Sequence, residues 1–161
     1  MRMRIGMILL LSSTASALSL GQLKSGALGL TTSFFETPNL GLAYATSENT
    51  RVSASVGFNF VHDSAGNSST YHFGVNVWRY VFTTESISNF FGGAAGFDAQ
   101  SNPVGTSSSV DLAALYGAEY WFSTKFALHG TLQIHFDTGK VFGSSVSRIF
   151  TSAETGLTWY F

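Results

Sequence analysis

From residue 25 to the C-terminus, hydrophobic and polar residues alternate with a period of two, which is typical of β-strands rather than helices. The clearest run covers residues 52–60, where valine, alanine and phenylalanine share one parity and serine, glycine and asparagine share the other. Strong runs also cover residues 110–122, 126–136 and 149–161, and weaker ones cover 27–34, 40–45, 71–77 and 90–98. The pattern therefore predicts eight strands, the smallest class of transmembrane barrel.

The connections between these runs alternate in length. Residues 47–50, 83–88 and 123–125 form short connections, whereas 62–70, 99–108 and 137–147 are longer and rich in serine, glycine and asparagine. The first connection on the long side, residues 35–39, is an exception because it is short. Short periplasmic turns opposite long external loops are the arrangement of outer-membrane barrels. We therefore expect three long loops on the outer side.

Aromatic residues gather at the ends of the expected strands. Trp78 with Tyr80, then residues 120–122, then residues 159–161 place all three tryptophans at one rim. Phenylalanine and tyrosine at positions 34, 60, 71, 97 and 136 fall at the other rim. Two such girdles indicate anchoring at the membrane interfaces. Strict alternation turns Trp78 and Trp121 inward and Arg79 toward lipid, so we expect a bulge near Val77 or snorkelling of Arg79.

Composition separates a membrane barrel from a soluble one. Charged residues make up 11% of the chain and aromatic residues 15%, and the net charge is −1. A soluble domain carries about 25–35% charged residues on its surface, and a nucleic-acid partner requires a basic surface. We therefore predict an all-β fold, a closed antiparallel transmembrane β-barrel of about eight strands in an up-and-down meander, with no nucleic-acid partner.

The N-terminus has the features of a cleavable signal peptide over residues 1–17. Arg2 and Arg4 precede the apolar run 5–11, which is too short to cross a bilayer as a helix, and Ala15-Ser16-Ala17 forms a cleavage pattern. The alternative for this segment is a buried first strand. The chain contains no cysteine and hence no disulfide. We expect export to the bacterial outer membrane and a barrel domain over residues 18–161.

Two segments carry a resemblance to a known family. The terminal residues 156–161, Gly-Leu-Thr-Trp-Tyr-Phe, and the hairpin 117–125, Gly-Ala-Glu-Tyr-Trp-Phe-Ser-Thr-Lys, are typical of a last strand and a periplasmic turn. The chain resembles the small bacterial outer-membrane barrels typified by the transmembrane domain of outer membrane protein A and by outer membrane protein X. The resemblance implies that Leu157, Trp159 and Phe161 are the signal read by the barrel-assembly machinery.

The polar parity of the strands predicts the content of the lumen. Eight strands leave an interior that side chains fill, so we do not expect a pore for large solutes. We expect a structural polar network, with no catalytic residue, metal or cofactor. His129 and His135 are too far apart along one strand, about 20 Å, to share an ion. The network residues are Asn59, Asn76, Asp111, Glu119, His129, Gln133, His135 and Glu154.

The register of one hairpin follows from its short turn. If Phe122 pairs with Phe126, the parity of both strands is kept, and Glu119 lies directly opposite His129 on the lumen side. Neither strand offers Glu119 a lysine or arginine, so we expect Glu119 and His129 to pair. The alternative is that each finds another partner, for instance Glu154 across the lumen.

The predicted function is a structural or loop-mediated interaction role, without enzymatic activity, for a barrel expected to be a monomer. Its expected partners are outer-membrane lipids and lipopolysaccharide, and the assembly machinery during biogenesis; the sequence does not identify a partner for the loops. The alternative is a lipid A-modifying enzyme of the acyl hydrolase or transferase type. The barrel deacylases have a serine two positions after a histidine, but the residue two positions after His135 is Asp137.

Overall fold

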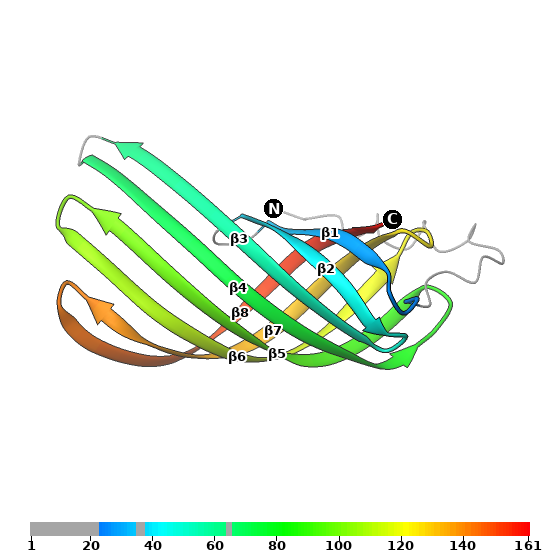
Figure 1. Cartoon of the computed structure of the whole chain (residues 1–161). Coiled ribbons are helices and arrows are strands. Elements are labelled where there is room, and N and C mark those ends of the chain that lie inside the picture. Colours follow the sequence, from blue (N-terminus) through cyan, green and yellow to red (C-terminus); the bar gives the residue numbers. More distant parts are fainter. Residues whose placement is uncertain (1–22, 35–37, 64–65) are drawn as a thin grey trace, which may run out of the picture.

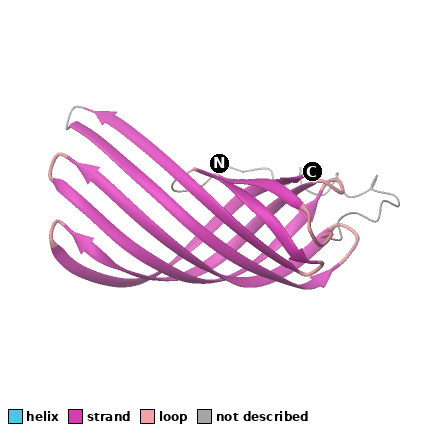
Figure 2. Ribbon diagram, in the orientation of Figure 1, coloured by secondary structure: helices cyan, strands magenta, loops and turns pink. Residues whose placement is uncertain are grey.

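The protein is an eight-stranded, closed, antiparallel β-barrel, as the alternation predicts (Figures 1 and 2). The computed structural model describes residues 23–34, 38–63 and 66–161, so the predicted signal peptide lies outside the described residues. Each strand pairs with its neighbour in the chain, and β1 pairs with β8 to close the ring. The strands are β1 Leu28–Ser33, β2 Asn39–Ser47, β3 Thr50–Asp63, β4 Gly66–Thr83, β5 Ile87–Asn102, β6 Gly105–Trp121, β7 Phe126–Val141 and β8 Ser144–Tyr160.

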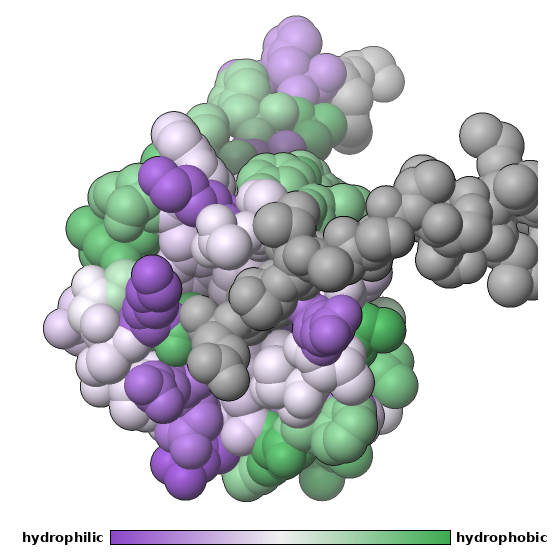
Figure 3. All heavy atoms as spheres, turned by 90° about the vertical axis from the view of Figure 1, so that its right-hand side faces the viewer, coloured by the Kyte–Doolittle hydropathy of each residue, from purple (hydrophilic) through white to green (hydrophobic). Residues whose placement is uncertain are grey.

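The apolar parity of the strands faces outward. Leu132 and Ile149 keep 67% and 74% of their surface exposed. Water-soluble proteins seldom expose a whole belt of large apolar side chains in this way. Viewed from the end with the short turns, hydrophilic residues gather on the end face and hydrophobic residues along the sides (Figure 3). A hydrocarbon environment around the barrel wall accounts for this distribution.

The prediction of three long loops is wrong, because most of the residues in these segments continue the strands. β5 and β6 stay paired up to Asn102 and Gly105, and β7 and β8 up to Val141 and Ser144. The Ser-rich segments lack hydrophobic alternation because both of their faces lie beyond the apolar belt. Backbone pairing does not require that alternation, and serine and threonine fit an extended chain. The outer ends are therefore long hairpins with tight turns.

The first hairpin, β1–β2, is much shorter than the other three hairpins that end on the same side. β1 pairs with β8 only between residues 29–33 and 156–160, and Phe34 N–H then donates to the Thr155 carbonyl at 3.1 Å. The pairing of β2 with β3 ends at Gly57, although β3 runs on to Asp63. Figure 1 shows the β1–β2 hairpin ending part-way along the barrel. In the described part of the chain, the outer parts of β3 and β8 therefore face a gap in the wall.

The tryptophan girdle predicted at the inner rim is also wrong. Trp78 and Trp121 are buried inside the barrel, and only Trp159 points outward. The register does shift in β4, but between Tyr80 and Phe82, which is after Trp78 and leaves it inward. Arg79 does face outward at the rim, where its Nη1 donates to Thr50 Oγ1 at 3.4 Å. The lumen takes the large rings because its inward glycines leave space for them.

Candidate functional site in the barrel lumen

The predicted register of β6 and β7 is confirmed, but the predicted partner of Glu119 is wrong. Glu119 lies opposite His129, and Tyr120 and Tyr116 lie opposite Leu128 and Leu132. The Glu119 carboxylate, however, accepts from Arg51 Nη1 at 2.8 Å. His129 Nδ1 is buried with no hydrogen-bond partner among the described residues. Arg51 reaches Glu119 from across the lumen, a contact that pairing between neighbouring strands does not reveal.

The Arg51–Glu119 ion pair is completely buried, with side-chain exposures of 1% and 0%. Arg51 Nη1 also donates to the Tyr160 hydroxyl at 2.9 Å, and the guanidinium lies 3.5 Å above the Trp78 ring centroid. The Tyr80 hydroxyl donates to the second Glu119 oxygen at 2.7 Å. Hydrogen bonds to both Glu119 oxygens and a cation–π contact thus replace part of the water that the two charges lost, while Arg51 Nε and Nη2 have no hydrogen-bond partner among the described residues.

Aromatic rings fill the space around this ion pair. Trp78 stacks on Phe90 with ring centroids 4.1 Å apart, and Trp121 stacks on Tyr160 at 5.4 Å. Glycine makes room for these rings, since a Cβ at Gly117 would lie 2.6 Å from the Phe90 ring. The buried hydrophobic cluster in the described residues consists of Leu23, Ala45, Trp78, Tyr80, Phe90, Leu115, Trp121, Ala127 and Tyr160. The inner half of the lumen is therefore packed like a protein core.

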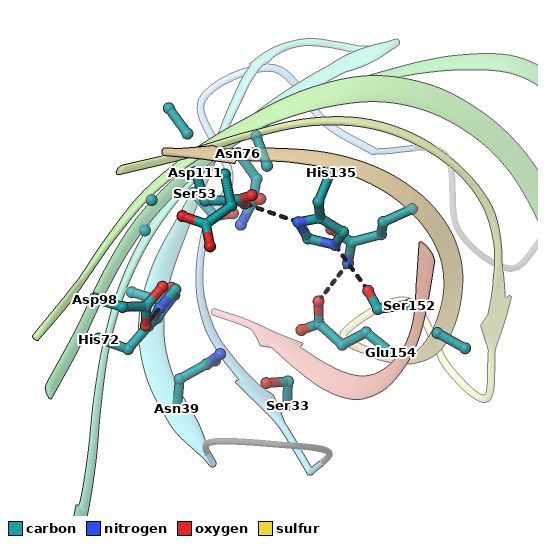
Figure 4. A pocket seen from close by; sticks show the side chains of 18 of the residues that line it. Ser33, Asn39, Ser53, His72, Asn76, Asp98, Asp111, His135, Ser152 and Glu154 are labelled. Carbon is teal, nitrogen blue, oxygen red and sulfur yellow. Dashed lines mark hydrogen bonds and ion pairs between the residues drawn. The ribbon is translucent and has the colours of Figure 1, made fainter. Parts of the chain in front are cut away.

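The outer half of the lumen is different, because it holds a polar cavity of about 160 Å³. On one wall of the cavity, hydrogen-bonding contacts link three side chains in a row (Figure 4). His135 Nδ1 lies 2.8 Å from Asp111 Oδ2, and His135 Nε2 lies 2.8 Å from Ser152 Oγ. Asp111 comes from β6, His135 from β7 and Ser152 from β8, so three consecutive strands build the group.

Further polar pairs line the rest of this cavity. Gln133 Nε2 donates to Glu154 at 2.8 Å. His72 Nδ1 lies 2.9 Å from Asp98 on the opposite wall (Figure 4). Nearer the outer end, Arg148 Nε donates to Asp137 at 2.6 Å. Each carboxylate named here has a nitrogen partner, which lowers the cost of placing it in the lumen.

The eight residues expected to form one network occupy three environments. Glu119 and His129 belong to the packed inner half, although they do not bond to each other. Asn76 borders the outer cavity, and Asn59 is exposed on the outer part of β3. The other four, which also border the outer cavity, are Asp111, Gln133, His135 and Glu154.

Sequence reasoning missed two residues that the structure places at the centre of these groups. Arg51 directly precedes the run 52–60 and shares its inward parity with Ser53 and Ser55, which was the available signal. Ser152 lies on the inward parity of β8 and reaches His135 diagonally, because the register pairs Gln133 with Ser152. Such diagonal neighbours lie within reach of a long side chain.

The residues of the expected assembly signal lie on the outer surface of β8 and at the C-terminus. Trp159 and Phe161 are exposed by 52% and 56%, and their rings meet edge to face with centroids 6.0 Å apart. Leu157 is half-buried. Within the ranges that the structure describes, no three His, Asp or Glu side chains come close enough together to hold a metal ion.

Solved structures of other proteins share this fold. The N-terminal β-barrel domain of OprF from Pseudomonas aeruginosa matches with a TM-score of 0.64 at 13% identity, over 86% of this chain and 100% of that chain. Neisserial surface protein A matches with a TM-score of 0.58 at 14% identity, over 84% of this chain and 94% of that chain. Both are small outer-membrane barrels of eight strands.

The chain therefore has the fold of the small eight-stranded outer-membrane β-barrels, as its resemblance to outer membrane proteins A and X implied. No protein-family model matches the chain, and no curated protein matches its sequence. At this level of identity, the likeness identifies the fold and leaves the role of the lumen to its own residues.

Proposed function

We propose that this protein is an integral barrel of the bacterial outer membrane that does not conduct solutes and presents three long β-hairpins outside the cell. The observation that carries this proposal is the packed inner half of the lumen around Arg51 and Glu119. A continuous water column would have to displace a buried ion pair and four stacked aromatic rings. The function is then structural or interactive, performed by a monomer among outer-membrane lipids and lipopolysaccharide.

The paired outer hairpins support a role in presenting a rigid surface. The tips of the β5–β6 and β7–β8 hairpins lie close together, because a Cβ on Gly105 would lie 3.0 Å from the Phe142 ring. Val104, at the tip of the β5–β6 hairpin, is 81% exposed. An ordered β-surface loses less conformational entropy on binding a partner than a flexible loop does. We also propose that Leu157, Trp159 and Phe161 are the signal that the assembly machinery reads during biogenesis.

Cysteine labelling on intact cells tests this placement, because the chain has no cysteine of its own. Val104→Cys at an outer tip should react with a membrane-impermeant maleimide on intact cells. Glu85→Cys, in the short β4–β5 turn, should react only after the outer membrane is permeabilised. Equal labelling of the two variants on intact cells, or protection of Val104→Cys alone, would contradict the proposed placement.

A further inference from the structure

The chain Asp111–His135–Ser152 has the order and spacing of a catalytic triad. With Nδ1–H donating to Asp111 Oδ2, His135 keeps Nε2 free to accept the proton of Ser152 Oγ, and both distances are 2.8 Å. Phe150 stacks flat on the imidazole with centroids 4.6 Å apart and an interplanar angle of 3°, which fixes the ring plane. A nucleophile held by a base, with the base oriented by a carboxylate, is the arrangement of serine hydrolases on many folds.

We propose that Ser152, His135 and Asp111 form a hydrolase site for acyl esters of lipids in the outer leaflet. The site lies beside the outer cavity, and His135 and Asp111 retain 13% and 15% exposure, so water can reach it. This activity goes beyond the structural role proposed above. It is consistent with a sealed lumen, because the seal lies in the inner half and the triad in the outer half.

In the part of the chain that the structure describes, the gap in the barrel wall offers a lipid a route to this site. Ser152 belongs to the part of β8 that extends past the last pairing with β1, at Gly156 and Thr155. Ile149, whose outward side chain belongs to the apolar belt, lies three residues further out, which is about 10 Å along the strand. Across the gap, Phe58 and Phe60 of β3 are also exposed to the outside. The gap therefore opens at the depth of lipid acyl chains.

The same gap exposes a backbone donor next to the nucleophile. The Thr155 carbonyl faces β1, and the N–H groups of alternate residues in a strand point to the same side. The Ala153 N–H therefore points to the side of β8 where the described part of β1 has ended. The N–H that follows the nucleophile in sequence forms half of the oxyanion hole in many serine hydrolases. We assign that role to Ala153.

The reaction needs only the ester and water. Ser152 Oγ bonds to the ester carbonyl carbon as His135 Nε2 takes the hydroxyl proton, and the Ala153 N–H stabilises the oxyanion. The ester C–O bond then breaks, and the leaving alcohol takes the proton from Nε2. Water next attacks the acyl-serine, giving one proton to Nε2, which returns it to Ser152 Oγ. The products are the free fatty acid and the deacylated lipid.

A serine-directed fluorophosphonate probe tests the nucleophile on the full-length protein purified from membranes. The wild-type barrel should be labelled, and Ser152→Ala and His135→Gln should lose the label. Ser33→Ala is the matched control, because Ser33 Oγ borders the same cavity and is buried without a hydrogen-bond partner. That variant should label like wild type. Heat-modifiable migration in gels would show that each variant is folded.

Fatty-acid release from vesicles tests the substrate class. Vesicles of phosphatidylethanolamine alone, and the same vesicles containing lipid A, distinguish a glycerophospholipid from a glycolipid ester, and release from either supports the proposal. Ser152→Ala should lower the rate by a factor on the order of 10² or more. Asp111→Asn, which tests a positioning residue, should lower kcat with little change in KM. The proposal fails if folded wild type shows neither labelling nor release, or if Ser152→Ala retains both.

Discussion

Arg51 and Glu119 lie in a part of the barrel where neither side chain touches water, and their charges meet at 2.8 Å. Moving two ions out of water costs several kcal/mol each, and mutual attraction offsets this only when the remaining hydrogen bonds are also made. Tyr80 and Tyr160 supply two such bonds, whereas Arg51 Nε and Nη2 are buried without a hydrogen-bond partner among the described residues. At the scale of single residues, the pair therefore contributes more to the specific filling of the lumen than to net stability.

Removal of one partner should be costly. We expect Glu119→Ala to lower the free energy of unfolding by about 3–5 kcal/mol, because Arg51 is left buried and uncompensated. Asp137→Ala is the control, since its partner Arg148 is 64% exposed and the loss should be about 1 kcal/mol or less. Urea unfolding in lipid vesicles, followed by tryptophan fluorescence, measures both. Equal losses in the free energy of unfolding for the two variants would contradict the claim that burial makes an unpaired Arg51 costly.

At the scale of residues, the sequence predicted which side chains face the lumen but not all of their partners. Parity predicted that Asp111, Glu119, Gln133 and Glu154 face inward, because a period of two determines the face of each position. It could not predict Arg51 as the partner of Glu119, since contacts across a lumen depend on barrel diameter and tilt rather than on adjacent strands. Glycine positions then decide which large ring fits, as Gly117 does for Phe90.

At the scale of strands and hairpins, hydrophobic alternation marked only the part of each strand that contacts lipid. β7 continues five residues past Phe136, where the expected strand ended, and the outer ends of β4, β5 and β6 also extend into predicted loops. The register of the β6–β7 hairpin was predictable because a short turn allows few pairings that keep parity. The outer ends of the hairpins could not be predicted, because a serine-rich sequence is compatible with both a loop and a strand.

The C-terminal strand carries the prediction about assembly. Phe161 follows β8 and is exposed, while its backbone N–H donates to the Leu28 carbonyl at 3.0 Å. If Leu157, Trp159 and Phe161 form the assembly signal, deletion of Phe161 should reduce the amount of folded, heat-modifiable protein in the outer membrane. Ser55→Ala, in the lumen, should not. Equal folded yields in membrane fractions would refute the assignment of the signal.

At the scale of the whole molecule, the barrel has two ends with different physical character. The inner half is a core of aromatic rings around an ion pair, and the outer half holds a polar cavity beside the gap that the described residues leave in the wall. The N-terminal hairpin is responsible for this difference, since β1 has 6 residues and β2 has 9, whereas β4 has 18. Composition predicted the membrane barrel. The gap could not be predicted, because it arises from the extension of the outer hairpins beyond the short β1–β2 hairpin.

The central claim is that side chains seal the lumen, and single-channel recording tests it most directly. The purified full-length barrel, inserted into a planar bilayer at neutral pH, should produce no stable single-channel currents, because no continuous water column passes Arg51, Trp78 and Trp121. Insertion would be checked in parallel by heat-modifiable migration of protein recovered from vesicles of the same lipid. Large, stable and reproducible channel currents from the folded wild-type protein would contradict the account.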